Sequence, residues 1–153
     1  MALSGINKGK GGEREICKLL NGILIILLKE MGRPQEDIHK AVNSVQRNQN
    51  QSAVGGGDLT NTWGMCIEVK RQETLVLNTW WNQCVASAKR NNEWPVLIYR
   101  QNGKSWQVRT YAFMSLPDGT DCHVVAEISY LHFQNWYKLW VKKKLEAGET
   151  IRS

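Results

Sequence analysis

Two acidic residues and a lysine in the middle of the chain have the types and spacing that metal-dependent phosphodiester hydrolysis requires. Asp58 follows three glycines, and Glu68 and Lys70 lie two positions apart in the alternating segment Met65–Lys70. If that segment is a strand, Glu68 and Lys70 project from the same face. Two converging carboxylates form the oxygen site that Mg²⁺ prefers. A neighbouring lysine can orient water and offset charge that grows on phosphorus.

The same segment has a simpler interpretation. Alternation of apolar and charged residues is typical of an amphipathic strand whose Glu and Lys are merely solvated. The upstream glycines favour the catalytic alternative, because glycine lets the backbone approach a ligand closely. If Asp58 begins a strand antiparallel to Met65–Lys70, its carboxylate can approach Glu68. The residues alone leave both interpretations open.

A third acid, Glu13, lies among basic residues near the amino terminus. Its neighbours include Lys8, Lys10 and Arg14, which is a natural setting for an acid that works beside DNA. The alternative is that Glu13 stabilises the positive end of a helix dipole. For an isolated glutamate at the start of a helix, that structural role is the expected one.

Periodicity and turn residues predict the elements that position these side chains. Residues 1–11 are basic and glycine-rich and predict a flexible segment. A helix follows from about Gly12 to Gly32, because its apolar residues recur at steps of three and four. The further elements expected are a short helix at 34–46, a loop to 57, a strand at 65–70, an extended segment at 74–77, a helix at 78–92 capped by Asn78 or Thr79, a hairpin at 94–113 around Asn102-Gly103, a short strand at 122–128 and a carboxy-terminal helix in the region 126–147.

This order predicts an α/β fold with a mixed β-sheet flanked by α-helices, and one domain over residues 1–153. The formal net charge of +6 favours a polyanionic partner, either nucleic acid or an acidic membrane surface. The four cysteines form no C-x-x-C pair, which predicts reduced thiols in a cytoplasmic protein. The apolar run Ile23–Leu28 is much shorter than the ~20 residues of a membrane span. The amino terminus also lacks the apolar core of a secretion signal.

Several segments together resemble a known nuclease family. They are "KGKGGERE" at 8–15, the glycine-led Asp58, "CIEVK" at 66–70, "LNTWWNQCVASA" at 77–88 and "PVLIYRQNGKSW" at 95–106. In this order they are similar to the archaeal-type Holliday junction resolvases, and to small phage proteins of that type, within the PD-(D/E)XK nuclease superfamily. The resemblance implies a restriction-endonuclease-like fold and spans roughly residues 8–110.

The resemblance also implies roles for individual residues. In such nucleases the acids hold Mg²⁺, for which Mn²⁺ should substitute, and the lysine helps to position the attacking water. The catalytic residues implied here are Glu13, Asp58, Glu68, Lys70 and Gln83, and the metal ligands are Glu13, Asp58, Glu68 and the carbonyl of Val69. For Gln83 the alternative is a plain amide on the helix surface. The chain departs from the family in having no proline before Asp58, a longer segment 32–57 and no clear counterpart for residues after about 115.

Basic and aromatic side chains are candidates for contact with DNA. The predicted phosphate contacts are Lys8, Lys10, Arg14, Arg47, Arg71, Lys89 and Arg90, although each could also be a solvated surface charge. An aromatic stripe at helical spacing is formed by Phe133, Trp136, Tyr137 and Trp140. Base stacking is one function for such a stripe, but packing in the core or at a subunit interface is the favoured one.

Together these features predict a metal-dependent, structure-specific DNA endonuclease that resolves Holliday junctions by phosphodiester hydrolysis. A four-way junction has two-fold symmetry, so two matched cuts require a homodimer with two sites. The expected partner is branched DNA and not a membrane. The expected location is the cytoplasm, which is the host cytoplasm if the protein is viral. The alternatives are a nuclease of the same fold with another task, such as nicking or DNA degradation, and a non-catalytic protein that binds branched DNA.

Overall fold

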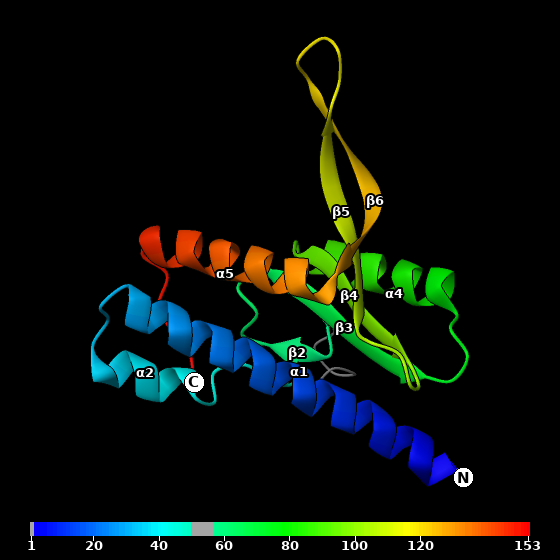
Figure 1. Ribbon diagram of the computed structural model, residues 1–153, viewed down its shortest axis with the longest axis horizontal. Coiled ribbons are helices and arrows are strands. Elements are labelled where there is room, and N and C mark those ends of the chain that lie inside the picture. Colours follow the sequence, from blue (N-terminus) through cyan, green and yellow to red (C-terminus); the bar gives the residue numbers. More distant parts are fainter. Residues whose placement is uncertain (1, 50–56) are drawn as a thin grey trace.

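A mixed sheet lies at the centre of the molecule (Figure 1). The computed structural model describes residues 2–49 and 57–153, with side chains described from residue 9 onward. The elements are α1 (Ala2–Glu30), α2 (Gln35–Ala41), β1 (Gln46–Arg47), β2 (Leu59–Thr60), β3 (Met65–Gln72), α4 (Leu77–Arg90), β4 (Trp94–Gln101), β5 (Gln107–Ser115), β6 (Asp121–Ser129) and α5 (Tyr130–Glu146).

The strand order of the main sheet is β3-β4-β5-β6. β3 and β4 are parallel, with Met65 opposite Trp94 at one end and Gln72 opposite Gln101 at the other. β4 and β5 are antiparallel, and so are β5 and β6. The predicted α/β fold with a mixed sheet flanked by helices is therefore confirmed. The predicted turn between β4 and β5 is also present, and its Gly103 has a φ of 78° that favours glycine.

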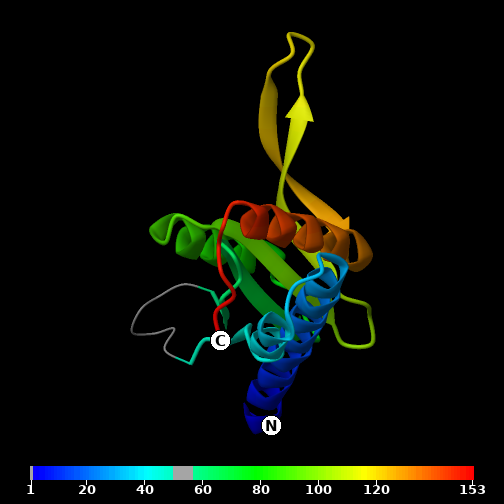
Figure 2. The same cartoon turned by 90° about the vertical axis from the view of Figure 1, so that its left-hand side faces the viewer.

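Alternation along β3 divides its side chains between the two faces of the sheet. Met65, Ile67 and Val69 are buried in the core that includes α1 and α5. On the other face, Cys84 of α4 packs on the sheet and its Sγ lies 3.6 Å from the carbonyl oxygen of Cys66. Figure 2 shows α4 on one side of the strands and α1 on the other. The alternation predicted for this strand is therefore present.

The buried face of α1 fixes the segment that leads to β1. Ile16, Leu20 and Leu24 on this face are fully buried, and Asn21 lies beside them. The Oδ1 atom of Asn21 accepts a hydrogen bond from the N–H of Val45 (2.8 Å), and its Nδ2 donates to the carbonyl of Val45 (3.1 Å). This reciprocal pair satisfies a buried amide and places the chain just before β1. Within the described ranges, no helix is long and apolar enough to cross a membrane.

The carboxy-terminal residues return to the same segment. The hydroxyl of Ser44 donates a hydrogen bond to the carbonyl of Arg152. The neighbouring Ile151 is 8% exposed and belongs to the main core. The segment before β1 is thus held from two directions, by α1 and by the chain end.

α1 begins earlier than predicted. Residues 2–11, which we expected to form a flexible basic segment ahead of a helix at Gly12, continue that helix back to Ala2. A Cβ added at Gly12 would lie 3.2 Å from the ring of Trp106 and 3.6 Å from Cγ1 of Val69, so the helix lies directly against the sheet here. This tertiary contact outweighs the low helix propensity of the local glycines.

The start of α4 also differs from the prediction. The extended segment expected at 74–77 is not a strand, and the helix begins at Leu77. Its N-cap residue is Val76, which makes no side-chain cap, whereas we expected Asn78 or Thr79. Packing of the helix on β4 therefore sets its start, without a local capping signal.

The carboxy-terminal helix runs from Tyr130 to Glu146, within the predicted region 126–147. β6 continues to Ser129, whose Oγ then accepts a hydrogen bond from the N–H of His132 (3.1 Å) and caps α5. Within α5, Phe133 and Tyr137 are fully buried in the main core. Core packing is therefore confirmed for these two members of the aromatic stripe.

The hairpin formed by β5 and β6 extends far beyond the body of the molecule (Figures 1 and 2). The two strands pair along their whole length, from Gln107 opposite Ser129 to Ser115 opposite Asp121. β4 pairs with β5 only as far as Arg109, so the distal part of the hairpin has no further strand beside β5 within residues 2–49 and 57–153. Residues 111–126 are called the arm below.

Candidate active site

Asp58 is held against β3 by its backbone and by its carboxylate. Its carbonyl accepts a hydrogen bond from the N–H of Asn48 (2.8 Å), and its own N–H donates to the carbonyl of Ile67 (2.8 Å). Oδ2 of Asp58 accepts from the N–H of Val69 (2.8 Å). Asp58 does not begin a strand that pairs with β3, because the strand after it, β2, pairs with β1. The carboxylate nevertheless reaches β3, as the prediction required.

The residue before Asp58 must be small because the chain here lies against the backbone of β3. A Cβ added at Gly57 would lie 2.6 Å from the carbonyl oxygen of Ile67 and 2.9 Å from its nitrogen. Backbone atoms in a paired strand cannot move aside as a flexible side chain can. The other two glycines of the predicted turn, Gly55 and Gly56, lie outside the described residues.

Glu68 lies next to Asp58 in a buried setting. The two residues are 6% and 8% exposed, respectively. Burial, followed by the charge of Asp58 and a hydrogen bond with its side chain, raises the pKa of Glu68 to about 9, and the charge of Lys70 opposes this shift. Two carboxyl groups this close are both ionised at low cost only when a cation compensates them. The pair is therefore a candidate cation site.

A cavity of about 390 Å³ opens on this acidic pair. Four of the predicted catalytic residues line it together, although they come from different elements. They are Asp58, Glu68, Lys70 and Gln83. Val69 is also at the site, because its N–H binds Asp58; the role of its carbonyl stays a prediction.

Ser87 and Asn48 are at the site but were not predicted from the sequence. Ser87 lines the cavity and is buried, and Arg90 donates to its hydroxyl from Nη2 (3.1 Å). Gln83, Ser87 and Arg90 follow one another at steps of four and three, so helical periodicity could have identified this face of α4. Asn48 binds the carbonyl of Gly57 through Nδ2 (3.0 Å), and no local pattern indicated that contact.

Glu13 is not among the residues that line the cavity. Its Oε2 is paired with Nε of Arg47 at 2.6 Å, and Arg47 lies on β1 opposite Leu59. Because α1 starts at Ala2, Glu13 is not at the helix start, and the dipole role is excluded too. In the described part of the chain, no group of three or more His, Cys, Asp or Glu side chains is placed to hold a metal. Two of the three predicted acids are thus brought together, and the third is paired elsewhere.

A larger cavity of about 650 Å³ is lined by Asn48 and Gly57, among others, and has no described lining residue in common with the first. Its acidic residues are Glu93 and Glu149, and Glu149 is paired with Lys144 at 3.4 Å. No lysine is among its described lining residues. Cavity volume alone therefore does not identify the active site. The smaller cavity is the candidate active site, because a lysine and two adjacent acids line it.

The predicted phosphate-contact residues occupy different environments. Lys10, Arg14 and Lys89 are exposed, whereas Arg90 lines the cavity. The side chain of Lys8 lies outside the described residues, and Arg47 is occupied by Glu13. Arg71 is opposite Arg100 on β4, and the Nε atoms of both are buried without a hydrogen-bond partner among the described residues. The guanidinium of Arg100 is engaged within the chain, because its Nη1 lies 3.8 Å from Oε1 of Glu15 and its central carbon lies 5.5 Å from the ring centroid of Trp106.

The sequence matches the model of the family described as "Phage putative PDDEXK endonuclease" over residues 5–147. The chain belongs to this phage PD-(D/E)XK endonuclease family. Comparison with curated proteins and with solved structures gives no match. The family agrees with the fold described above and with the nuclease superfamily that the sequence resembles.

The PD-(D/E)XK endonuclease pattern can be followed in this chain with one change. Asp58 and the run Glu68-Val69-Lys70 supply the acid and the acid–any–lysine element. Gly57 stands where the family pattern has proline. The close approach to Ile67 explains the change, because a proline ring would meet the strand backbone that even a single Cβ would touch.

The acids of this endonuclease fit a divalent cation. PD-(D/E)XK nucleases generally use divalent metals such as Mg²⁺. Asp58 and Glu68 offer hard oxygen atoms. Burial and then the charge of Asp58 raise the pKa of Glu68, and a bound cation would compensate both effects. Neither a histidine nor a cysteine lines the cavity among the described residues, which favours Mg²⁺ or Mn²⁺ over zinc.

Gly57→Ala is expected to damage both the stability and the activity of the endonuclease, because the new methyl group must push Asp58 away from β3. We expect a loss of about 1–3 kcal/mol in the free energy of unfolding and cleavage slowed at least ~10-fold. Gly22→Ala is the matched control, since a Cβ there meets nothing within 4 Å. Urea unfolding and cleavage assays measure both effects, and wild-type values for Gly57→Ala would contradict the close approach.

Proposed function

We propose that this endonuclease cleaves branched DNA, with the four-way junction as its preferred substrate, by metal-dependent hydrolysis of the phosphodiester. The observation that supports this most is the convergence of Asp58, Glu68 and Lys70 on one cavity. As a member of a phage family, the protein would act in the cytoplasm of the host.

Asp58 and Glu68 would hold the divalent cation, with the carbonyl of Val69 as a further donor. Their side chains are pre-positioned: Asp58 by the N–H of Val69 and Glu68 by the pleat of β3. A cation bound there would supply Lewis-acid activation of water and neutralisation of phosphate charge. We do not include Glu13 in this set, because its carboxylate is paired with Arg47.

The remaining cavity residues would act on the substrate itself. Lys70 lies on the same face of β3 as Glu68, where its ammonium group can orient the attacking water and offset the negative charge that develops on the phosphoryl oxygens. Gln83 and Ser87, one turn apart on α4, can hold the phosphate or the water by hydrogen bonds. Arg90 adds positive charge at the same edge of the cavity.

The DNA backbone would lie across the side of the molecule where α1, β3 and β4 meet. Arg71 of β3 is beside α1 there, because a Cβ added at Gly12 would lie 3.7 Å from Cβ of Arg71. Lys10 and Arg14 are exposed on the same helix. Each phosphate contact of this kind is expected to add about 0.9 to the magnitude of the slope of the logarithm of the binding constant against the logarithm of salt concentration.

A substrate panel tests the proposal. The protein is incubated with a four-way junction, a flap, a single strand and a linear duplex of matched sequence, with Mg²⁺, with Mn²⁺ and with EDTA. We expect cleavage with either metal, fastest on the junction, and none with EDTA. Products should carry 5′-phosphate and 3′-hydroxyl ends.

The outcomes separate the alternatives. Metal-dependent cleavage that is no faster on the junction than on the other substrates would support the nuclease activity and overturn the preference for branched DNA. That result would favour nicking or degradation of DNA. Junction binding without cleavage in either metal would overturn the enzyme and leave a binding protein. Two symmetric cuts in one junction would support the homodimer that we propose as the active form.

A further inference from the structure

The arm exposes apolar side chains that the body of the molecule does not cover. Phe113, Met114 and Val125 are 63%, 54% and 50% exposed. In addition, β6 is the outer strand of the sheet and has no strand partner on its far side among the described residues. Monomeric proteins avoid a long, exposed apolar edge strand, because such a strand can pair with another chain.

The charge of the arm is opposite to that of the rest of the chain. Residues 111–126 contain no lysine or arginine and two aspartates, Asp118 and Asp121, while the whole chain has a formal net charge of +6. A DNA backbone would be repelled by this surface. A protein surface with apolar pockets and basic side chains is the complementary partner.

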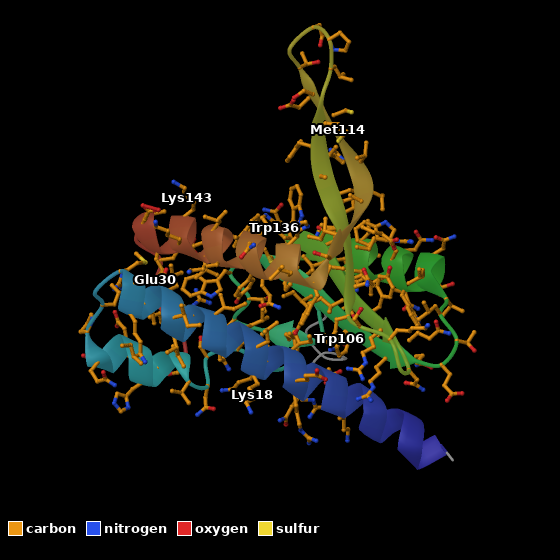
Figure 3. All side chains as sticks on the ribbon, viewed as in Figure 1. Lys18, Glu30, Trp106, Met114, Trp136 and Lys143 are labelled. Carbon is orange, nitrogen blue, oxygen red and sulfur yellow. The ribbon has the colours of Figure 1, made fainter. Side chains whose placement is uncertain are left out.

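Such a surface is present on α5. A cavity of about 440 Å³ is lined by Trp136, Leu139, Trp140, Lys143 and Lys144, and we call it the α5 groove. Leu139 is 61% exposed, and the side chain of Lys143 is 82% exposed. Figure 3 shows Met114 on the arm and Trp136 and Lys143 on α5.

The arm and the α5 groove belong to one continuous aromatic surface. The ring of Trp94 lies 5.8 Å from Phe113 of the arm and 6.2 Å from Trp140 of the groove. Trp140 in turn lies 5.8 Å from Trp136. Because the two complementary parts are on the same face, two copies can bury both at once about a two-fold axis, each arm in the other's groove.

We propose that the homodimer of this protein is formed by reciprocal docking of the arm of one chain into the α5 groove of a second copy. Apolar arm residues fill the groove between Trp136 and Trp140, and Asp118 and Asp121 meet the lysines at the end of α5. The inference rests on the dimer in the proposed function and names its surface. It also gives a role to residues 116–126, for which the sequence analysis found no counterpart in the resolvases.

Molar mass in solution tests the interface without DNA or metal. Light scattering during size-exclusion chromatography at micromolar concentration is expected to give a dimer for the wild-type protein. Met114→Ser combined with Val125→Ser, and separately Leu139→Glu, should weaken dimerisation at least ~10-fold. All three residues are at least half exposed, so folding should survive, and circular dichroism checks it. Val42→Ser is the matched control, since Val42 is also 50% exposed but lies at the end of α2.

Disulfide trapping gives an independent test of which surfaces meet. All four cysteines are free, and Cys122 on the arm is exposed while Cys17, Cys66 and Cys84 are buried. Adding Leu139→Cys should allow oxidation to join Cys122 of one chain to position 139 of the other, giving a covalent dimer. Adding Val42→Cys instead should not.

Each result either supports or overturns the interface. A wild-type monomer, a dimer unaffected by the arm and groove variants, or a Cys122 cross-link formed only within one chain would overturn it. Arm variants that lose junction binding without any change in mass would overturn it too and assign the arm to DNA. Cleavage of linear DNA by the same variants reports on the nuclease chemistry separately, so failure of the interface is distinguishable from failure of the proposed function.

Discussion

Glu68→Gln and Asp58→Asn are expected to abolish metal-dependent cleavage, each by about 10³-fold or more. Both substitutions keep the size of the side chain and remove the negative charge that would hold the cation. Because the two acids are adjacent and buried, no solvent-exposed acid can take the place of either one as a metal ligand. Single-turnover cleavage of a labelled four-way junction measures the loss, and binding of the junction by the same variants should be retained.

Stability provides the control for this result. Burial and Asp58 raise the pKa of Glu68 to about 9, so an ionised Glu68 disfavours the folded state when no cation is present. Glu68→Gln should therefore melt at the same temperature as wild type or higher in EDTA, and it should lose the stabilisation that Mg²⁺ gives the wild-type protein. An active Glu68→Gln variant, or one that is inactive only because it is unfolded, would contradict the assignment.

Lys70→Met is expected to reduce the cleavage rate about 10²-fold with little change in junction affinity. Methionine preserves the length and apolar stem of the lysine but not its charge, so the loss isolates the ammonium group. Lys89→Met is the matched control, because it removes the same charge from an exposed position on α4. We expect the control to change the rate by less than about threefold.

Separate measurements of the cleavage rate and of DNA affinity decide how Lys70 acts. If Lys70→Met lowers affinity and leaves the rate at saturating DNA intact, Lys70 is a phosphate-binding residue and not a catalytic one. If Lys89→Met loses as much activity as Lys70→Met, the effect is one of general charge. Measurements over a range of salt concentrations separate these cases, since backbone contacts change the salt slope.

The part of the site that could be predicted from the sequence depends on local periodicity. The period of two along Met65–Lys70 placed Glu68 and Lys70 on one face of the strand. This alternation is a property of strand geometry, so it is the same in the folded structure. Gln83 came from the family resemblance, and the 3.6-residue period of α4 would have added Ser87. These residues lie in regular elements whose side-chain directions follow from geometry.

The rest of the site depends on contacts between distant segments, which no local pattern specifies. Arg47 lies 34 positions from Glu13, and no local pattern predicts the ion pair that they form. The position of Asp58 depends on how closely Gly57 approaches β3, and the early start of α1 depends on packing against Trp106. The strand predicted at 122–128 is present as β6, but the projection of the arm from the body could not be foreseen, because it depends on where β4 stops pairing with β5.

The hydrogen bond from Ser44 to the carbonyl of Arg152 has a consequence for biosynthesis. It joins residues 108 positions apart, and it helps to hold the segment that delivers Asp58 through β1 and β2. During translation, that tie can form only after residue 152 has left the ribosome. The segment that carries Asp58 is therefore expected to gain this support late in synthesis, after α5 has been made.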